Sequence, residues 1–176
     1  MSTATAATEA AATPDMVKLK TKDGQVFEVE RELAVRSMTL KNMLDDTDSE
    51  NAMVDMGPVD AETASLVIEY LRFAAWAETA KKTRHSEVFQ KWQSGFMAVA
   101  LGDAYDTQRY KLLEAANYLD IKGLIDVVTG YYADQIFRCK EPEAIRERFK
   151  IKNDFTPAEE AEVRKTHPMP PATGAA

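Results

Sequence analysis

Apolar and polar residues alternate in two neighbouring segments near the start of the chain, VKLK at 17–20 and FEVE at 27–30. The pair Asp23-Gly24 lies between them. A period of two on both sides of an Asp-Gly pair predicts a β-hairpin, because glycine readily adopts the positive φ of a tight turn. A further short strand is expected around Asp55. The predicted sheet is therefore small and built from local strands.

Beyond the hairpin, apolar positions recur every three or four residues, which is the spacing of helices. Ser37 is placed to cap a helix that contains Leu40 and Leu44, and Asp60 to cap a longer helix that contains Val67. The same spacing predicts three further helices, within the segments 89–99, 110–119 and 121–138.

Two short helices are expected to follow, each with a proline near its start. Proline is favoured there because the first N–H groups of a helix have no hydrogen-bond partner within the helix, so its missing N–H costs nothing. The first is EPEAIRERF at 141–149, and the second opens at Thr156-Pro157-Ala158-Glu159. The Thr156 hydroxyl can accept from the backbone N–H of Glu159, while the Glu159 carboxylate accepts from the backbone N–H of Thr156. This reciprocal pair predicts a capping box.

The helix after Asp120 carries more apolar surface than one docking face needs. At 100° per residue, an arc of about 180° that is apolar except at Gln135 runs from Val127 across Leu124 to Ile136. A helix packed on one core needs an arc of little more than about 100°. Periodicity alone leaves two interpretations open, a helix at the centre of its own domain or a helix with a second face for a partner.

The segment after this helix favours the second interpretation. Four apolar residues stand among the 14 charged residues of segment 140–165, and little core can form there. They are Ile145, Phe149, Ile151 and Phe155. Residues of this kind can cover a helix and can also form a groove for a partner helix.

Composition indicates a soluble globular protein of 176 residues, 45% of them hydrophobic and 29% charged. No apolar run approaches the roughly 20 residues that span a bilayer, so no membrane association is expected. The 22 Lys and Arg residues stand against 29 Asp and Glu residues, which gives a net charge of −7. Because phosphate contacts need clustered basic residues, nucleic-acid binding is not expected either.

Residues for catalysis or metal binding are scarce. No glycine spacing forms a phosphate-binding loop. His85 and His167 lie in a connecting segment and a tail, and with the single Cys139 they are too few for a structural zinc site. One cysteine cannot form an internal disulfide, which fits a reducing compartment. A hydrolase that uses Cys139 or His85 stays an alternative, but we expect no enzyme, no metal and no cofactor.

Both ends of the chain are expected to be disordered tails. Residues 1–14 are mainly Ala and Thr without Lys or Arg, which does not make a secretory signal. Residues 167–176 contain three prolines and no charged residue after the histidine.

Two stretches of the chain are distinctive, AANYLDIKGLIDV at 115–127 and EPEAIRERFKIKNDFTPAEEAEVRK at 141–165. They closely resemble the Skp family, the adaptor subunits of SCF-type cullin-RING ubiquitin ligases, and the segment 17–44 is similar to the start of that family. The resemblance weakens between about residues 74 and 109. It implies a mainly helical α/β protein, with a BTB/POZ domain and small sheet at 15–138 and an F-box-binding helical extension at 139–166.

The resemblance also implies two partner surfaces. Asn117 and Tyr118 correspond to contacts with the cullin scaffold, with ordinary helix surface as the alternative. The F-box groove is implied on the helix after Asp120 and on the two short helices, which agrees with the wide apolar arc, although internal core is the alternative for some members. These residues are Ile125, Thr129, Tyr132, Ile136, Phe149, Ile151, Asn153 and Phe155.

The chain departs from the family pattern at several places. Glu141 replaces a threonine that would cap the helix at Pro142, which removes about 1 kcal/mol of local support. Extra residues lie around 101–106, the loop at 77–87 is basic rather than acidic, and THPMPPATGAA replaces an acidic Trp-containing end. From the changed C-terminal end we expect the clamp over the F-box helix to be missing or altered. Because the matching proline is hydroxylated and glycosylated in some protist relatives, Pro142 is a candidate modification site.

The implied function is an adaptor that bridges a cullin to F-box substrate receptors in the cytoplasm and nucleus. An elongin C-like adaptor is an alternative, although it should end near the ANYLD segment. A Skp-like subunit of a non-ligase assembly, such as a kinetochore complex, is another. A weak homodimer of the free protein, formed through exposed apolar surface, also stays open.

Overall fold

A computed structural model describes residues 15–47, 52–83, 86–99, 106–139 and 141–167. The chain divides into two compact units, Met1–Thr129 and Gly130–Ala176. Several predictions fall outside the described residues. They concern the tail at 1–14, all of the tail at 167–176 except His167, the histidine His85, and most of the extra segment at 101–106. None of the described helices is long and apolar enough to cross a membrane.

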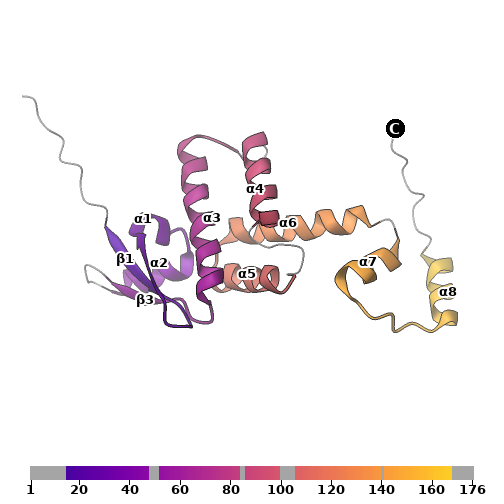
Figure 1. Cartoon of the computed structure of the whole chain (residues 1–176). Coiled ribbons are helices and arrows are strands. Elements are labelled where there is room, and N and C mark those ends of the chain that lie inside the picture. The colour runs from indigo at the N-terminus through magenta and orange to yellow at the C-terminus, as the bar shows by residue number, and fades with distance from the viewer. Residues whose placement is uncertain (1–14, 48–51, 84–85, 100–105, 140, 168–176) are drawn as a thin grey trace, which may run out of the picture. The chain divides into compact units, whose positions relative to one another are not determined.

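The first unit contains a three-stranded sheet in the N-terminal, indigo-to-purple part of the chain (Figure 1), and its strand order is β2-β1-β3. The strands are β1 (Met16–Lys20), β2 (Val26–Glu30) and β3 (Met53–Asp55). β1 pairs antiparallel with β2, with Val17 opposite Val29, and parallel with β3, with Leu19 opposite Val54. Gly24 has a φ of +82° in the turn between β1 and β2. The predicted Asp-Gly hairpin and the short strand at Asp55 are thus confirmed.

Five helices and the start of a sixth complete the described part of the first unit. They are α1 (Arg31–Ala34), α2 (Met38–Asp45), α3 (Ala61–Thr79), α4 (Glu87–Val99), α5 (Asp106–Tyr118) and α6 (Lys122–Arg138). Both predicted caps form: Ser37 Oγ accepts from Leu40 N at 3.1 Å, and Asp60 Oδ1 accepts from Thr63 N at 2.9 Å. The sequence did not predict α1, a four-residue helix without a side-chain cap.

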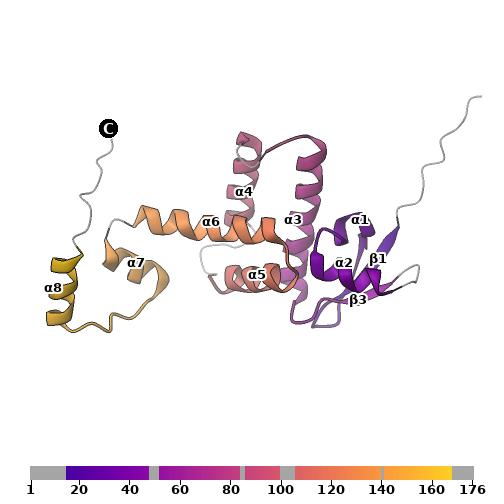
Figure 2. The same cartoon turned by 180° about the vertical axis from the view of Figure 1, so that it is seen from behind.

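The core of the first unit lies where the sheet, α2, α3, α5 and the start of α6 meet. Its largest fully buried side chains include leucines from each of these elements, namely Leu19, Leu40, Leu71, Leu112 and Leu124. α3 and α4 run side by side in both views (Figures 1 and 2). An aromatic cluster joins them, in which the Phe73 and Trp92 rings stack with centroids 3.7 Å apart.

The second unit holds the end of α6 with α7 (Pro142–Phe149) and α8 (Pro157–Thr166). The capping box at Thr156 and Glu159 is confirmed, and Glu141 makes no side-chain cap bond, as its replacement of threonine predicts. Neither α7 nor α8 contains a buried residue. Because short helices depend on packing for most of their stability, these two helices are expected to be only weakly stable.

Candidate partner-binding surfaces

The predicted cullin contacts lie in the last turn of α5. Asn117 and Tyr118 are both exposed, and the Tyr118 residue is 39% exposed. On the other side of the same helix, Leu112, Ala115 and Ala116 are buried in the core of the first unit. The pair is therefore presented to solvent by a helix whose opposite side is anchored.

Two hydroxyl groups bind the carbonyl groups at the C-terminal end of α5. Ser37 Oγ donates to Leu119 O at 2.6 Å, and Thr39 Oγ1 donates to Tyr118 O at 2.8 Å. The last carbonyls of a helix lack partners within it, so these bonds satisfy groups that otherwise need water. Asp120, with a φ of +48°, reverses the chain directly afterwards. Sequence reasoning identified Ser37 only as the cap of α2 and missed Thr39, because both bonds join residues about 80 positions apart.

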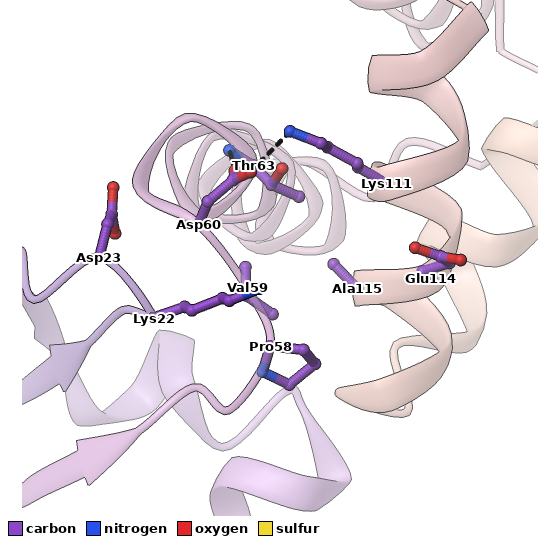
Figure 3. A pocket seen from close by; sticks show the side chains of 9 residues that line it. All are labelled: Lys22, Asp23, Pro58, Val59, Asp60, Thr63, Lys111, Glu114 and Ala115. Carbon is purple, nitrogen blue, oxygen red and sulfur yellow. Dashed lines mark hydrogen bonds and ion pairs between the residues drawn. The ribbon is translucent and has the colours of Figure 1, made fainter.

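A polar cleft of about 540 Å³ lies where the N-terminus of α3 faces α5 (Figure 3). Lys111 Nζ binds Asp60 Oδ2 at 2.9 Å across it, and Gln108 donates to Thr63 Oγ1 at 3.2 Å. On the other side of the cleft, Asp23 accepts from the backbone N–H of Ala61 at 3.1 Å. These bonds fix α5 on α3, and thereby fix the helix that carries Asn117 and Tyr118.

These hydrogen bonds shift the pKa values of three charged groups around the cleft. The hydrogen bond from the Thr63 side chain, with further contributions from Lys111, lowers the pKa of Asp60 from 3.8 to about 2. The bond to Asp60 in turn raises the pKa of Lys111. The hydrogen bond from the Thr21 hydroxyl lowers the pKa of Asp23. All three groups thus stay charged at neutral pH. The polar residues around the cleft stabilise the packing of α5 against α3.

The apolar arc of α6 divides between buried and accessible positions. Leu124, Val127 and Val128 are buried in the first unit. The predicted F-box contacts on this helix are more accessible: Ile125 is half-buried, and Thr129 is exposed and donates to Ile125 O at 2.8 Å.

Near its end, α6 becomes more exposed. Tyr132 is half-buried, and Ile136 is 45% exposed. Phe137, 86% exposed, was missed by sequence reasoning because it falls outside the apolar arc. Periodicity could not predict the exposure of Phe137. It indicates which side of a helix is apolar, but not at which residue the helix extends beyond the core.

Within the second unit, the structure brings together some of the predicted F-box contacts. The Tyr132 and Phe149 rings lie with centroids 6.0 Å apart. Ile151 and Phe155 are 54% and 46% exposed, and Asn153 Oδ1 accepts from Phe155 N at 3.2 Å. The segment between α7 and α8 thus holds its apolar side chains at the surface with local bonds.

Four charged residues tie α7 to α8. Arg146 binds Glu160 at 3.2 Å and lies 3.9 Å from Glu143, while Arg164 binds Glu143 and lies 3.6 Å from Glu160. The Arg146 guanidinium also lies over the Phe155 ring, 5.9 Å from its centroid. Sequence reasoning missed this network, although it noted the charge density of the segment.

Two of the residues considered for chemistry, Cys139 and His167, lie within the described part of the chain. Cys139 is half-buried, and its Sγ donates to Gln135 O at 3.3 Å. His167 lies at the end of α8, next to Thr166. No group of three His, Cys, Asp or Glu side chains within the described residues could hold a metal ion. Pro142, the candidate modification site, is the half-buried first residue of α7.

Comparison with known proteins matches two parts of the chain to one family. Residues 15–75 match the Skp1 family tetramerisation domain, and residues 122–169 match the Skp1 family dimerisation domain. The first match adds the POZ assignment to the small sheet and helices of the first unit, which confirms the predicted fold class.

Relatives cover most of the chain. SKP1-like protein 3 and SKP1-like protein 4 of Arabidopsis thaliana are 41% and 39% identical, each over 88% of this chain and 94% of the relative. SCF ubiquitin ligase complex protein SKP1b of Dictyostelium discoideum is 36% identical over 85% of this chain and 92% of the relative.

Proposed function

This chain belongs to the Skp1 family, and from that premise we propose that it is the adaptor subunit of an SCF-type ubiquitin ligase. It bridges a cullin scaffold to F-box substrate receptors in the cytoplasm and nucleus and carries out no chemistry itself. Its contribution to ubiquitin transfer is proximity, because it holds a bound substrate near the enzyme that modifies it.

The F-box surface is carried by the C-terminal part of the chain. One observation supports it above all: Ile136, Ile151 and Phe155 are about half exposed, and α7 and α8 bury no residue. Apolar side chains held at the surface in this way mark a surface that a partner covers. We infer that Ile125, Thr129 and Tyr132 of α6, together with Phe149 and Asn153, also contact a helical F-box segment, and we call the full set the F-box seat.

The cullin surface is the exposed end of α5, at Asn117 and Tyr118. A tyrosine suits this role because it offers a large rigid ring with a hydroxyl at low cost in side-chain entropy. The bonds from Ser37 and Thr39 hold its backbone before any partner arrives. We place the two surfaces in different parts of the chain, with the BTB/POZ domain at 15–138 and the F-box-binding extension at 139–166.

Two substitutions test whether the surfaces are separate. Tyr118→Lys places a charge where a ring contacts the cullin, and we expect at least a tenfold loss of cullin affinity with unchanged F-box affinity. Phe155→Ala removes a ring from the F-box seat, and we expect the reverse. Affinities for a cullin N-terminal domain and for an F-box segment, measured by isothermal titration calorimetry, give both values for each variant.

Equal loss of both partners in either variant would show that the surfaces are misassigned. Unchanged F-box affinity in Phe155→Ala would remove Phe155 from the seat. F-box binding without any cullin binding in the unmodified protein would favour a subunit of a non-ligase assembly.

A further inference from the structure

We propose that Gly57 is a positioning residue for cullin binding, because its missing side chain leaves the space in which the Tyr118 ring lies. This inference rests on the proposed function, since it concerns how the cullin contact at the end of α5 is held. It adds the turn between β3 and α3 to the elements that shape this surface.

The close approach of the two residues is direct. A Cβ atom built on Gly57 would lie 2.5 Å from Tyr118 Cζ and 2.8 Å from Cε1, and closer still to the Tyr118 hydroxyl oxygen. Carbon atoms that are not bonded to each other do not approach below about 3 Å, since contacts are optimal at about 3.5–4.0 Å. Any side chain at position 57 therefore has to displace the Tyr118 ring or the turn itself.

The turn is not free to move away. Gly57 N donates to Asp55 Oδ1 at 2.7 Å, and Met56 N donates to Lys20 O of β1 at 2.8 Å. Gly57 itself has a φ of +62°, a conformation that side-chain-bearing residues rarely adopt. Met56 is fully buried. Because the sheet and core hold the turn, the Tyr118 ring is the part that has to yield.

Tyr118 is thus fixed at two points. The Thr39 hydroxyl binds its backbone carbonyl, and the turn at Gly57 supports its ring. A ring held in place before binding loses less conformational freedom when the partner docks, which favours affinity. Gly57 acts through Tyr118 in this arrangement and need not touch the cullin.

Gly24 provides a matched comparison within the same unit. It also lies in a turn with positive φ, +82°, but a Cβ built there meets no atom within 4 Å. Gly24→Ala therefore imposes the backbone strain of an alanine at positive φ without displacing any side chain. The difference between Gly57→Ala and Gly24→Ala isolates the displacement of Tyr118.

The test measures cullin and F-box affinities of the full chain for Gly57→Ala, Gly24→Ala and Tyr118→Ala. We expect Gly57→Ala to weaken cullin binding at least tenfold and Gly24→Ala to change it by less than twofold, with F-box affinity unchanged in both. Unchanged cullin affinity in Tyr118→Ala would instead refute the proposed cullin surface. Loss in Tyr118→Ala, with Gly57→Ala equal to Gly24→Ala, would refute the positioning role alone.

The double variant Gly57→Ala/Tyr118→Ala keeps the test decisive if Gly57→Ala folds poorly. Removing the ring removes the clash, so we expect the double variant to bind cullin no more weakly than Tyr118→Ala. We also expect it to melt no lower relative to Tyr118→Ala than Gly24→Ala melts relative to the unmodified protein. A double variant that fails to fold, or that melts much lower than this, would show that Gly57 does not act through the Tyr118 ring.

Discussion

Ser37 joins the start of α2 to the chain just after α5 through a single hydroxyl group. Its hydroxyl is fully buried and makes two bonds at once, accepting from Leu40 N at 3.1 Å and donating to Leu119 O at 2.6 Å. A serine hydroxyl has one donor and two acceptor positions, so the two bonds are compatible. Ser37→Ala removes both.

The free-energy cost of losing each hydrogen bond can be estimated separately. Loss of an N-cap costs about 1 kcal/mol. A buried carbonyl that loses its donor costs about 1–3 kcal/mol, because no water replaces the hydroxyl. We therefore expect Ser37→Ala to lower the free energy of unfolding by about 2–4 kcal/mol.

Thr39→Ala is the matched control, because Thr39 donates to the neighbouring carbonyl of Tyr118 at an exposed site. Water can replace this bond, so we expect a loss below about 1 kcal/mol. Urea unfolding followed by circular dichroism at 222 nm measures both variants under the same conditions. Equal losses in the two variants would refute the reasoning, since burial would then not decide the strength of these bonds.

The remaining predictions concern pH dependence and the C-terminal helices. Because the pKa of Asp60 is lowered from 3.8 to about 2, its stabilising effect is complete above pH 3.8 and is lost as the pH falls toward 2. Urea unfolding between pH 5 and pH 3 should show the unmodified protein losing more stability than Asp60→Asn, by at most about 1 kcal/mol, because this window covers only part of the shift; parallel losses would contradict the role of the Asp60 charge. In the partner-free protein, backbone amides of α7 and α8 should exchange much faster than those of α3, because neither short helix buries a residue. Glu160→Gln, which weakens the pairs with Arg146 and Arg164, should speed exchange in α8 more than Glu162→Gln does; strong protection of α8 in the partner-free protein, or equal effects of the two variants, would count against this view of the network.

Features determined by neighbouring residues were predictable from the sequence. The turn at Gly24, the cap at Asp60 and the box at Thr156 each depend on residues within four positions, and the structure contains all three. The wide apolar arc of α6 likewise follows from spacing along a single helix. The family resemblance then supplied partner surfaces that spacing alone left ambiguous.

Features that depend on distant residues were not predictable. Thr39 and Tyr118 are 79 positions apart, and nothing near either residue marks the bond between them. The contact of Gly57 with the Tyr118 ring depends equally on tertiary packing. The short helix α1 has no side-chain cap and too few residues to show a period. The role of each residue in partner binding stays a prediction until it is measured.

The most direct test of the adaptor role is simultaneous binding. The full chain, an F-box segment and a cullin N-terminal domain can be mixed and followed by size-exclusion chromatography with light scattering. We predict a single species that contains one copy of each, with each partner's affinity unchanged by the presence of the other. If the two partners displace each other, or if either fails to bind, the protein does not bridge a cullin to F-box receptors.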